Sequence, residues 1–80
     1  MTRESVYERL NGVFQEVFDD DSIEVHDKTT AEDIEDWDSF EHINLIVAIE
    51  EEFHFKIPMG KTVTMENVGE MVDLILEMGR

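Results

Sequence analysis

Apolar residues recur at helical spacing in three stretches of the chain. The first covers residues 3–18, and its apolar positions are Val6, Leu10, Val13, Phe14, Val17 and Phe18. The last covers residues 65–78, and its apolar positions are Met65, Val68, Met71, Val72, Ile75 and Leu76. The spacing predicts amphipathic helices. We expect Thr2 to cap the first and Thr64 to cap the last, because a threonine hydroxyl accepts a free N–H of the first turn.

The middle stretch, residues 39–53, is apolar on more than one face. Its apolar residues are Phe40, Ile43, Leu45, Ile46, Val47, Ala48, Ile49 and Phe53. A helix with this pattern is expected to be buried on most sides. The polar positions that remain for solvent or a partner are Glu41, Asn44, Glu50 and Glu51.

The connections between these helices are unequal. The first spans residues 19–38, and a connection of this length needs anchors on the core. The expected anchors are Ile23, Val25, Ile34 and Trp37. We predict one helical turn opened by Thr29 or Thr30, and a tryptophan that covers the core while its indole N–H finds a partner. The second connection holds an extended link before Pro58 and a short helix at residues 59–65.

Together these elements predict an all-α fold: a small bundle of three main helices and one short helix, with a long loop between the first two helices. Composition agrees with one domain, residues 1–80. There is no cysteine, no signal-peptide pattern and no apolar run of the roughly 20 residues that span a membrane. We therefore expect a monomeric, cytoplasmic protein.

Charge restricts the partners further. The chain has 21 acidic and 6 basic residues, a formal net charge of −15. Nucleic acids and anionic membranes are therefore poor partners, whereas basic protein surfaces are good ones. No Lys or Arg lies between Lys28 and Lys56. This acidic interval favours a docking surface for cationic proteins over a surface that is merely solvated.

The start of the middle helix carries the motif with the most chemical meaning. Asp38 is suited to be the N-cap, and Glu41 three residues later completes a capping-box pattern. Ser39 then occupies the first helical position, at the positive end of the helix dipole. Free backbone N–H groups there would tolerate a phosphate ester. From these residues alone, an ordinary serine at a helix start is the simpler interpretation.

The run Asp38-Ser39-Phe40, the apolar helix that follows and its end in Glu50-Glu51-Glu52-Phe53 resemble the acyl carrier proteins. The signature of that family is Asp-Ser-Leu at the start of a central helix, and the resemblance covers nearly the whole chain. It implies that Ser39 carries a 4′-phosphopantetheine arm from coenzyme A, which holds acyl groups as thioesters. It also implies that the middle helix faces partner enzymes through Asp38, Glu41, Asn44, Val47, Glu50 and Glu51.

The partners implied by the resemblance are a phosphopantetheinyl transferase and acyl-loading, acyl-transfer and condensing enzymes with basic docking surfaces. Housekeeping fatty-acid carriers usually read Gly-Ala-Asp-Ser-Leu, whereas this chain has Asp36-Trp37-Asp38-Ser39-Phe40. The chain is therefore more similar to stand-alone carriers of specialised acyl, polyketide or aminoacyl pathways. Phe40 and Phe53 are expected to fill space that a bound acyl chain would need, and Asn44 replaces an acidic residue common in the family.

Other kinds of site are disfavoured. Ser39 and His42 share a helix face, but no strand-to-helix elbow or oxyanion hole accompanies them, so we expect no catalysis. The three aspartates at 19–21 lack EF-hand spacing, and His26, His42 and His54 are not spaced as metal ligands. The remaining alternative is an acidic helical interaction module without an arm, which would dock the same helix on a basic protein.

Overall fold

The computed structural model describes residues 1–58, 60 and 65–79. Its elements are the helix α1 (Arg3–Val17), the 3-10 turn η1 (Ala31–Asp33) and the helices α2 (Ser39–Phe53) and α4 (Val68–Met78). The predicted all-α architecture is confirmed, including the long loop and the turn within it. The short helix predicted at residues 59–65 falls on positions 59 and 61–64, which lie outside the described residues.

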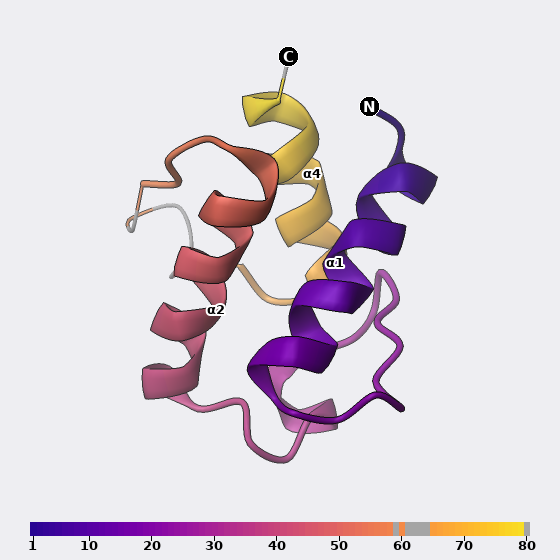
Figure 1. Ribbon diagram of the computed structural model, residues 1–80, viewed down its shortest axis with the longest axis vertical. Coiled ribbons are helices and arrows are strands. Elements are labelled where there is room, and N and C mark those ends of the chain that lie inside the picture. Colours follow the sequence, from indigo (N-terminus) through magenta and orange to yellow (C-terminus); the bar gives the residue numbers. More distant parts are fainter. Residues whose placement is uncertain (59, 61–64, 80) are drawn as a thin grey trace.

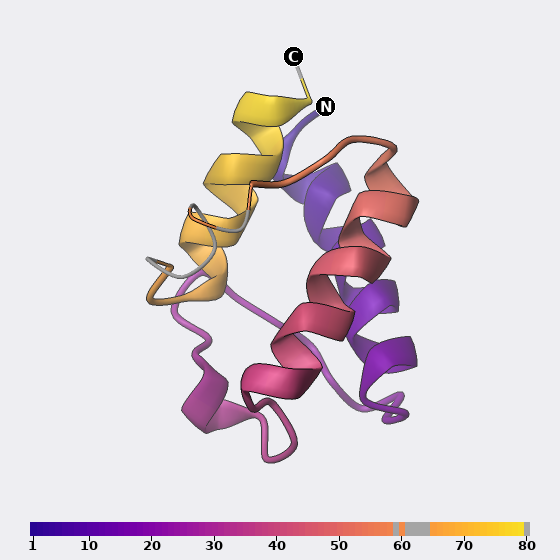
Figure 2. The same ribbon diagram turned by 90° about the vertical axis from the view of Figure 1, so that its left-hand side faces the viewer.

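Helix α1 is the common partner of the other two helices, since it contacts both α2 and α4. Figures 1 and 2 show α1 and α2 running in opposite directions; the loop between them leaves α1 at the lower end, rises beside α1 and returns to the lower end, where α2 begins. Helix α4 runs from the middle of the molecule toward the opposite end, where it finishes near the N-terminus (Figure 1). Ser39 therefore lies at the loop end, far from both termini.

The start of α1 follows the sequence prediction. The Thr2 hydroxyl accepts the N–H of Ser5 at 3.1 Å, and the Ser5 hydroxyl accepts the N–H of Thr2 at 3.0 Å, which makes a complete capping box. The helix ends at Val17, one residue before the predicted end, because Phe18 takes the C-cap position. The buried residues of α1 are Val6, Leu10, Val13 and Phe14.

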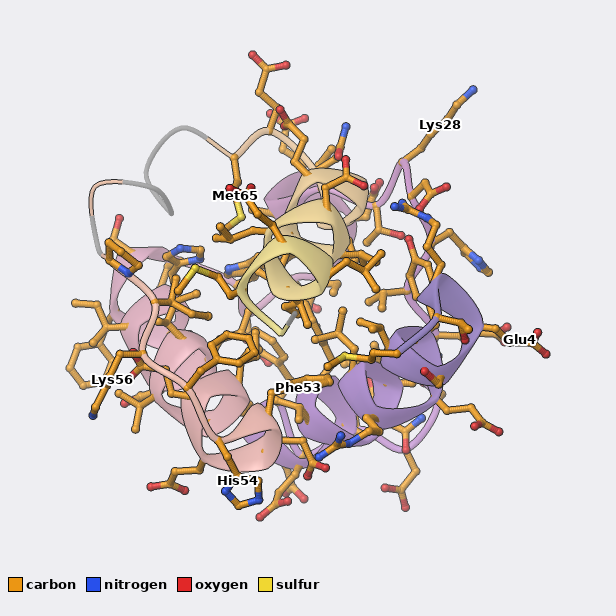
Figure 3. All side chains as sticks on the ribbon, turned by 90° about the horizontal axis from the view of Figure 1, so that it is seen from above. Glu4, Lys28, Phe53, His54, Lys56 and Met65 are labelled. Atoms are coloured by element: carbon orange, nitrogen blue, oxygen red, sulfur yellow. The ribbon has the colours of Figure 1, made fainter. Side chains whose placement is uncertain are left out.

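One hydrophobic core joins the three helices. Helix α2 contributes Leu45, Ile46, Ile49 and Phe53, and α4 contributes Val68, Met71, Val72, Leu74 and Ile75. Figure 3, a view along the bundle from the end opposite Ser39, shows Phe53 pointing inward between the helices, whereas Glu4, Lys28 and Lys56 point outward. Each large apolar side chain removed from water in this way contributes about 1.5–3 kcal/mol.

The long loop is anchored to this core as predicted. Val25 is buried, while Ile23, Ile34 and Trp37 are partly buried against the core. The N–H of Val25 also donates to the side-chain oxygen of Asn11 in α1 at 2.7 Å. The loop is thus fixed by apolar contacts and by hydrogen bonds to its neighbours, which explains how it can be long and still ordered.

The polar anchors of the loop lie where it meets α1 and α4. The Arg3 guanidinium bridges the carboxylates of Asp27 and Asp73, and the Tyr7 hydroxyl donates to Asp27 as well. The two hydrogen bonds to Asp27 hold its pKa below the usual range. Burial and the bond to Asp27 raise the pKa of Tyr7 to about 12. Asp27 is therefore ionised and Tyr7 protonated at neutral pH, and these are the states that hold the loop in place.

Helix α4 begins later than predicted, and its cap is Asn67 rather than Thr64. The Asn67 side-chain oxygen accepts the N–H of Glu70 at 2.9 Å. The next N–H groups have partners outside the helix: Val68 donates to the carbonyl of Thr29 at 2.8 Å, and Gly69 donates to the carbonyl of Asp27 at 2.9 Å. Asn67 with Glu70 three residues later is a local helix-start pattern, and contact with the loop fixes the start of α4 at this point.

Gly69 is required by this contact. A Cβ at that position would lie 2.8 Å from the carbonyl oxygen of Asp27, a backbone atom that cannot move aside cheaply. Only glycine lets the first turn of α4 approach the loop so closely.

The prediction that α2 would be buried on most sides is wrong. Three of its apolar side chains are largely exposed: Phe40 at 72%, Ile43 at 51% and Val47 at 48% of their full area. Helix α1 is the principal neighbour of α2, so one side of α2 is covered and the opposite side faces solvent. Phe40 therefore does not fill core space, although Phe53 does.

Candidate functional site

Ser39 is the first residue of α2, and its side chain is exposed at the helix start. Asp38 before it has extended backbone angles and caps the helix: its carboxylate accepts the N–H of Glu41 at 2.8 Å, and its carbonyl accepts the N–H of His42 at 2.8 Å. The N–H groups of Ser39 and Phe40 precede the first intrahelical hydrogen bond, so they point out of the helix end. The Ser39 hydroxyl thus lies where an anionic substituent is favoured.

The predicted capping box at this end is only half formed. The Glu41 carboxylate does not return to the Asp38 N–H; it accepts a hydrogen bond from the Asn44 side chain at 3.2 Å. The Asp38 N–H instead donates to the carbonyl of Asp36 at 3.1 Å. Glu41 and Asn44 therefore form a linked polar pair on the surface of α2.

Trp37 covers the core directly before this helix start, as predicted. Its ring meets Phe14 edge-on, with centroids 5.2 Å apart and an interplanar angle of 77°. Its indole N–H donates to Nδ1 of His42 at 3.1 Å, and the two rings lie almost parallel at 13°. Burial lowers the pKa of His42 below its ordinary value. The imidazole is thus neutral, with Nδ1 as acceptor.

This hydrogen bond also decides what His42 can do for Ser39. A base that activates a serine must offer its free ring nitrogen to the serine hydroxyl. In His42 that nitrogen, Nδ1, is engaged by Trp37. Within the described part of the chain, no hydrogen bond joins Ser39 to His42, and no group of three or more His, Asp or Glu side chains could hold a metal ion.

The residues predicted to face partners divide into two kinds. Asp38, Asn44, Val47 and Glu51 are exposed. Glu41 and Glu50 are partly buried, and the Glu50 carboxylate accepts the backbone N–H of Ile57 at 2.6 Å. Glu50 therefore also holds the chain that follows α2 against the helix.

Sequence reasoning missed two exposed residues. Phe40 and Ile43 were expected in the core, but they lie on the surface with Val47, and the spacing of these three places them along one side of α2. We call Phe40, Ile43 and Val47 the α2 stripe. A signal was present: α2 has more apolar residues than one neighbouring helix can cover. Exposed apolar side chains beside acidic ones are typical of a protein interaction site.

Within the described ranges, no helix has both the length and the apolar composition that crossing a membrane demands. A scan against protein-family models found no match, and neither did a search of curated proteins.

A search of solved structures found a close likeness. The chain superimposes with a TM-score of 0.84 on the solution NMR structure of a holo acyl carrier protein from Geobacter metallireducens. The two sequences are 40% identical, and the match covers 90% of this chain and 83% of the other. Likeness at this level of identity and coverage goes beyond a shared fold.

Proposed function

The chain belongs to the acyl carrier protein family, and on this premise we propose that Ser39 is the attachment site of a 4′-phosphopantetheine arm. The observation that carries the proposal is the position of Ser39: an exposed hydroxyl on the first residue of α2, beside N–H groups that have no carbonyl partner in the helix. The related protein is described as a holo form. Proteins of this family carry acyl groups and are not enzymes.

The site fits such a group chemically. The helix end stabilises the added phosphodiester charge by about 0.3–1 kcal/mol. The chain has no cysteine, so the arm supplies the thiol on which acyl groups are held as thioesters. Attachment would use coenzyme A: the Ser39 oxygen forms the new bond to phosphorus, and the adenosine bisphosphate leaves as the pyrophosphate bond breaks. The hydroxyl proton passes to a base of the transferase, because His42 is engaged by Trp37.

We propose that partners dock on α2 around Ser39. The α2 stripe supplies an apolar centre, and the surrounding polar residues are Asp38, Glu41, Asn44, Glu50 and Glu51. An apolar centre with an acidic rim suits a partner surface that is apolar in the middle and basic around it. The partners of this kind are a phosphopantetheinyl transferase and the enzymes that load, transfer and condense acyl groups.

The sequence before Ser39 supports a finer assignment, to the stand-alone carriers of specialised pathways. Where housekeeping carriers usually have Gly-Ala before the Asp-Ser pair, this chain has Asp36-Trp37. Trp37 is built into the core cover through Phe14 and His42, so the departure has a structural role here.

The experiment that tests the attachment is the intact mass of the protein after incubation with coenzyme A and a broad-specificity phosphopantetheinyl transferase. We expect a gain of one phosphopantetheine group in the wild type and none in Ser39→Ala. Ser22→Ala is the matched control, because it removes another exposed serine hydroxyl and should still gain the group. Circular dichroism should show the same helical content in all three proteins.

The result also separates the carrier from an arm-free interaction module. Such a module would gain no mass with several transferases, and Ser39→Ala would still bind its basic partner. Phe40→Leu, which restores the usual family residue, should be tried with each transferase before the attachment is rejected.

A further inference from the structure

The bond between Trp37 and His42 is not needed for the carrier chemistry, yet its two residues flank the attachment serine in the chain. It joins the residue two positions before Ser39 to the residue three positions after it. Trp37 is also held on its other sides: its backbone N–H donates to the carbonyl of Ile34 at 3.1 Å, and its ring contacts Phe14. The bond to His42 is therefore the link between the anchored loop and the first turn of α2.

The direction of this bond fixes the protonation state that it requires. An indole N–H can only donate, so Nδ1 of His42 must carry a lone pair and Nε2 must carry the proton. A protonated imidazolium has two N–H donors and no acceptor. Protonation of His42 would place two donors face to face and break the link to Trp37.

We propose that His42 is a positioning residue for the modification of Ser39: through its bond from Trp37 it holds residues 37–39 in the arrangement that a transferase recognises. The inference rests on the proposed attachment at Ser39. It assigns no proton transfer to His42, since the imidazole acts only by accepting the hydrogen bond from Trp37.

The surroundings of His42 set the pH range in which the link exists. A cavity of about 100 Å³ separates His42 and Trp37 from the start of α4, and Glu66 is the other titratable group among its described lining residues. On its own helix, the nearest carboxylates are Asp38 and Glu41, which are engaged at the cap and by Asn44. Burial disfavours the imidazolium, so the pKa of His42 lies below its ordinary 6.5.

The sign of the pH effect follows from this direction. Since the unfolded chain binds a proton at His42 more readily than the folded chain, stability falls as pH drops below about 6.5. The bond to Trp37 is fully present above that pH and is lost as pH falls through the lower pKa of the folded protein.

The first test uses the apo protein without any transferase. Trp37 is the one tryptophan of the chain, so the indole N–H resonance and the tryptophan fluorescence report on this side chain alone. We expect both to change in one step as pH falls through the pKa of His42, which lies below its ordinary 6.5. His42→Asn keeps an acceptor that does not titrate and should remove the step, whereas His26→Asn and His54→Asn should keep it. An unchanged step in His42→Asn would overturn the proposal.

The second test measures the rate of modification. His42→Phe keeps an aromatic ring but has no acceptor, and it should lower kcat/KM for the transferase about fivefold. His42→Asn should restore the rate to within about twofold of wild type. Because the transferase has its own pH dependence, wild type and His42→Asn should compete in one mixture at each pH. We expect the rate of wild-type modification relative to that of His42→Asn to decrease as pH falls.

The proposal is overturned if a folded His42→Phe is modified as fast as wild type, or if His42→Asn is as slow as His42→Phe. Thermal unfolding of each variant shows whether it is folded. A wild-type protein that gains no arm would refute the attachment at Ser39 instead, and the indole titration would still report whether His42 holds Trp37.

Discussion

The two ends of α2 both carry large apolar residues but differ in what covers them. At the C-terminal end, Ile49 and Phe53 are buried, and the Arg9 guanidinium lies over the Phe53 ring at 4.5 Å while it pairs with Glu52 at 2.8 Å. At the N-terminal end, Phe40 and Ile43 lie in solvent. One helix thus serves both as a structural element and as an interaction surface. Its apolar side chains that point into the core stabilise the fold, and those that point into solvent are available to a partner.

The difference has a geometric cause. Helix α1 covers one side of α2 and supplies Arg9 to its far end, whereas at the near end the loop places Trp37 against His42. Residues spaced by three or four along α2 share a side of the helix. The α2 stripe therefore lies on one side, and the buried residues Leu45, Ile46, Ile49 and Phe53 lie on another.

The largest expected contrast is between two isoleucines. Ile49→Ala should lower the free energy of unfolding by about 2–5 kcal/mol, because it removes buried methyl groups and leaves a cavity. Ile43→Ala removes the same atoms from a half-exposed site and should change it by no more than about 0.5 kcal/mol. Urea denaturation measures both. If Ile49→Ala does not fold, Ile49→Val should cost about 0.5–1.5 kcal/mol. Equal losses at the two sites would refute the contrast.

The exposed end should matter for docking instead. Phe40→Ala should lower kcat/KM with a phosphopantetheinyl transferase about tenfold, since an aromatic residue at the centre of an interface often contributes more than 1 kcal/mol. Its melting temperature should stay close to that of wild type. His54→Ala, exposed at the other end of α2, is the matched control and should keep the wild-type rate. A normal rate for Phe40→Ala would place the docking surface elsewhere.

The contacts of Arg9 with Phe53 and Glu52 at the C-terminal end of α2 should have a smaller effect on stability. Arg9→Met keeps the apolar stem of the side chain but removes the charge over Phe53 and the pair with Glu52. We expect a loss of about 1 kcal/mol that shrinks in high salt, because both partners are about 42% exposed. Lys56→Met is the control, as an exposed cation with no ion pair among the described residues. If the loss of stability in Arg9→Met is the same at low and high salt, packing rather than charge stabilises the C-terminal end of α2.

The smallest effect on stability is expected at His54, the C-cap residue of α2. His54 has a left-handed backbone, with φ of 61° and ψ of 44°, which costs a side-chain-bearing residue energy that glycine avoids. His54→Gly should raise stability by about 0.5–1 kcal/mol. At the opposite end, Asp38 has extended angles, so Asp38→Gly should bring no such gain. Thermal unfolding compares the two, and a destabilised His54→Gly would count against the backbone argument.

The sequence predicted the parts of the fold that depend on local order. The periodicity of α1 and α2, the Thr2 and Asp38 caps and the loop anchors were all readable from spacing and residue type. The prediction of the start of α4 was wrong, because Asn67 caps it where the loop carbonyls of Asp27 and Thr29 accept its first N–H groups. Those carbonyls are some forty residues away in the chain, and no local pattern contains them.

By itself, the sequence determined that the protein is helical, that it is strongly acidic and that an aspartate-serine pair opens the middle helix, because periodicity, charge and capping are properties of neighbouring residues. Only the tertiary structure decided which apolar residues of that helix face solvent, that Glu50 also holds the Ile57 backbone, and that His42 is the acceptor for Trp37. These features depend on which side of α2 its neighbours cover and how far their side chains reach, and that is fixed only when the helices pack.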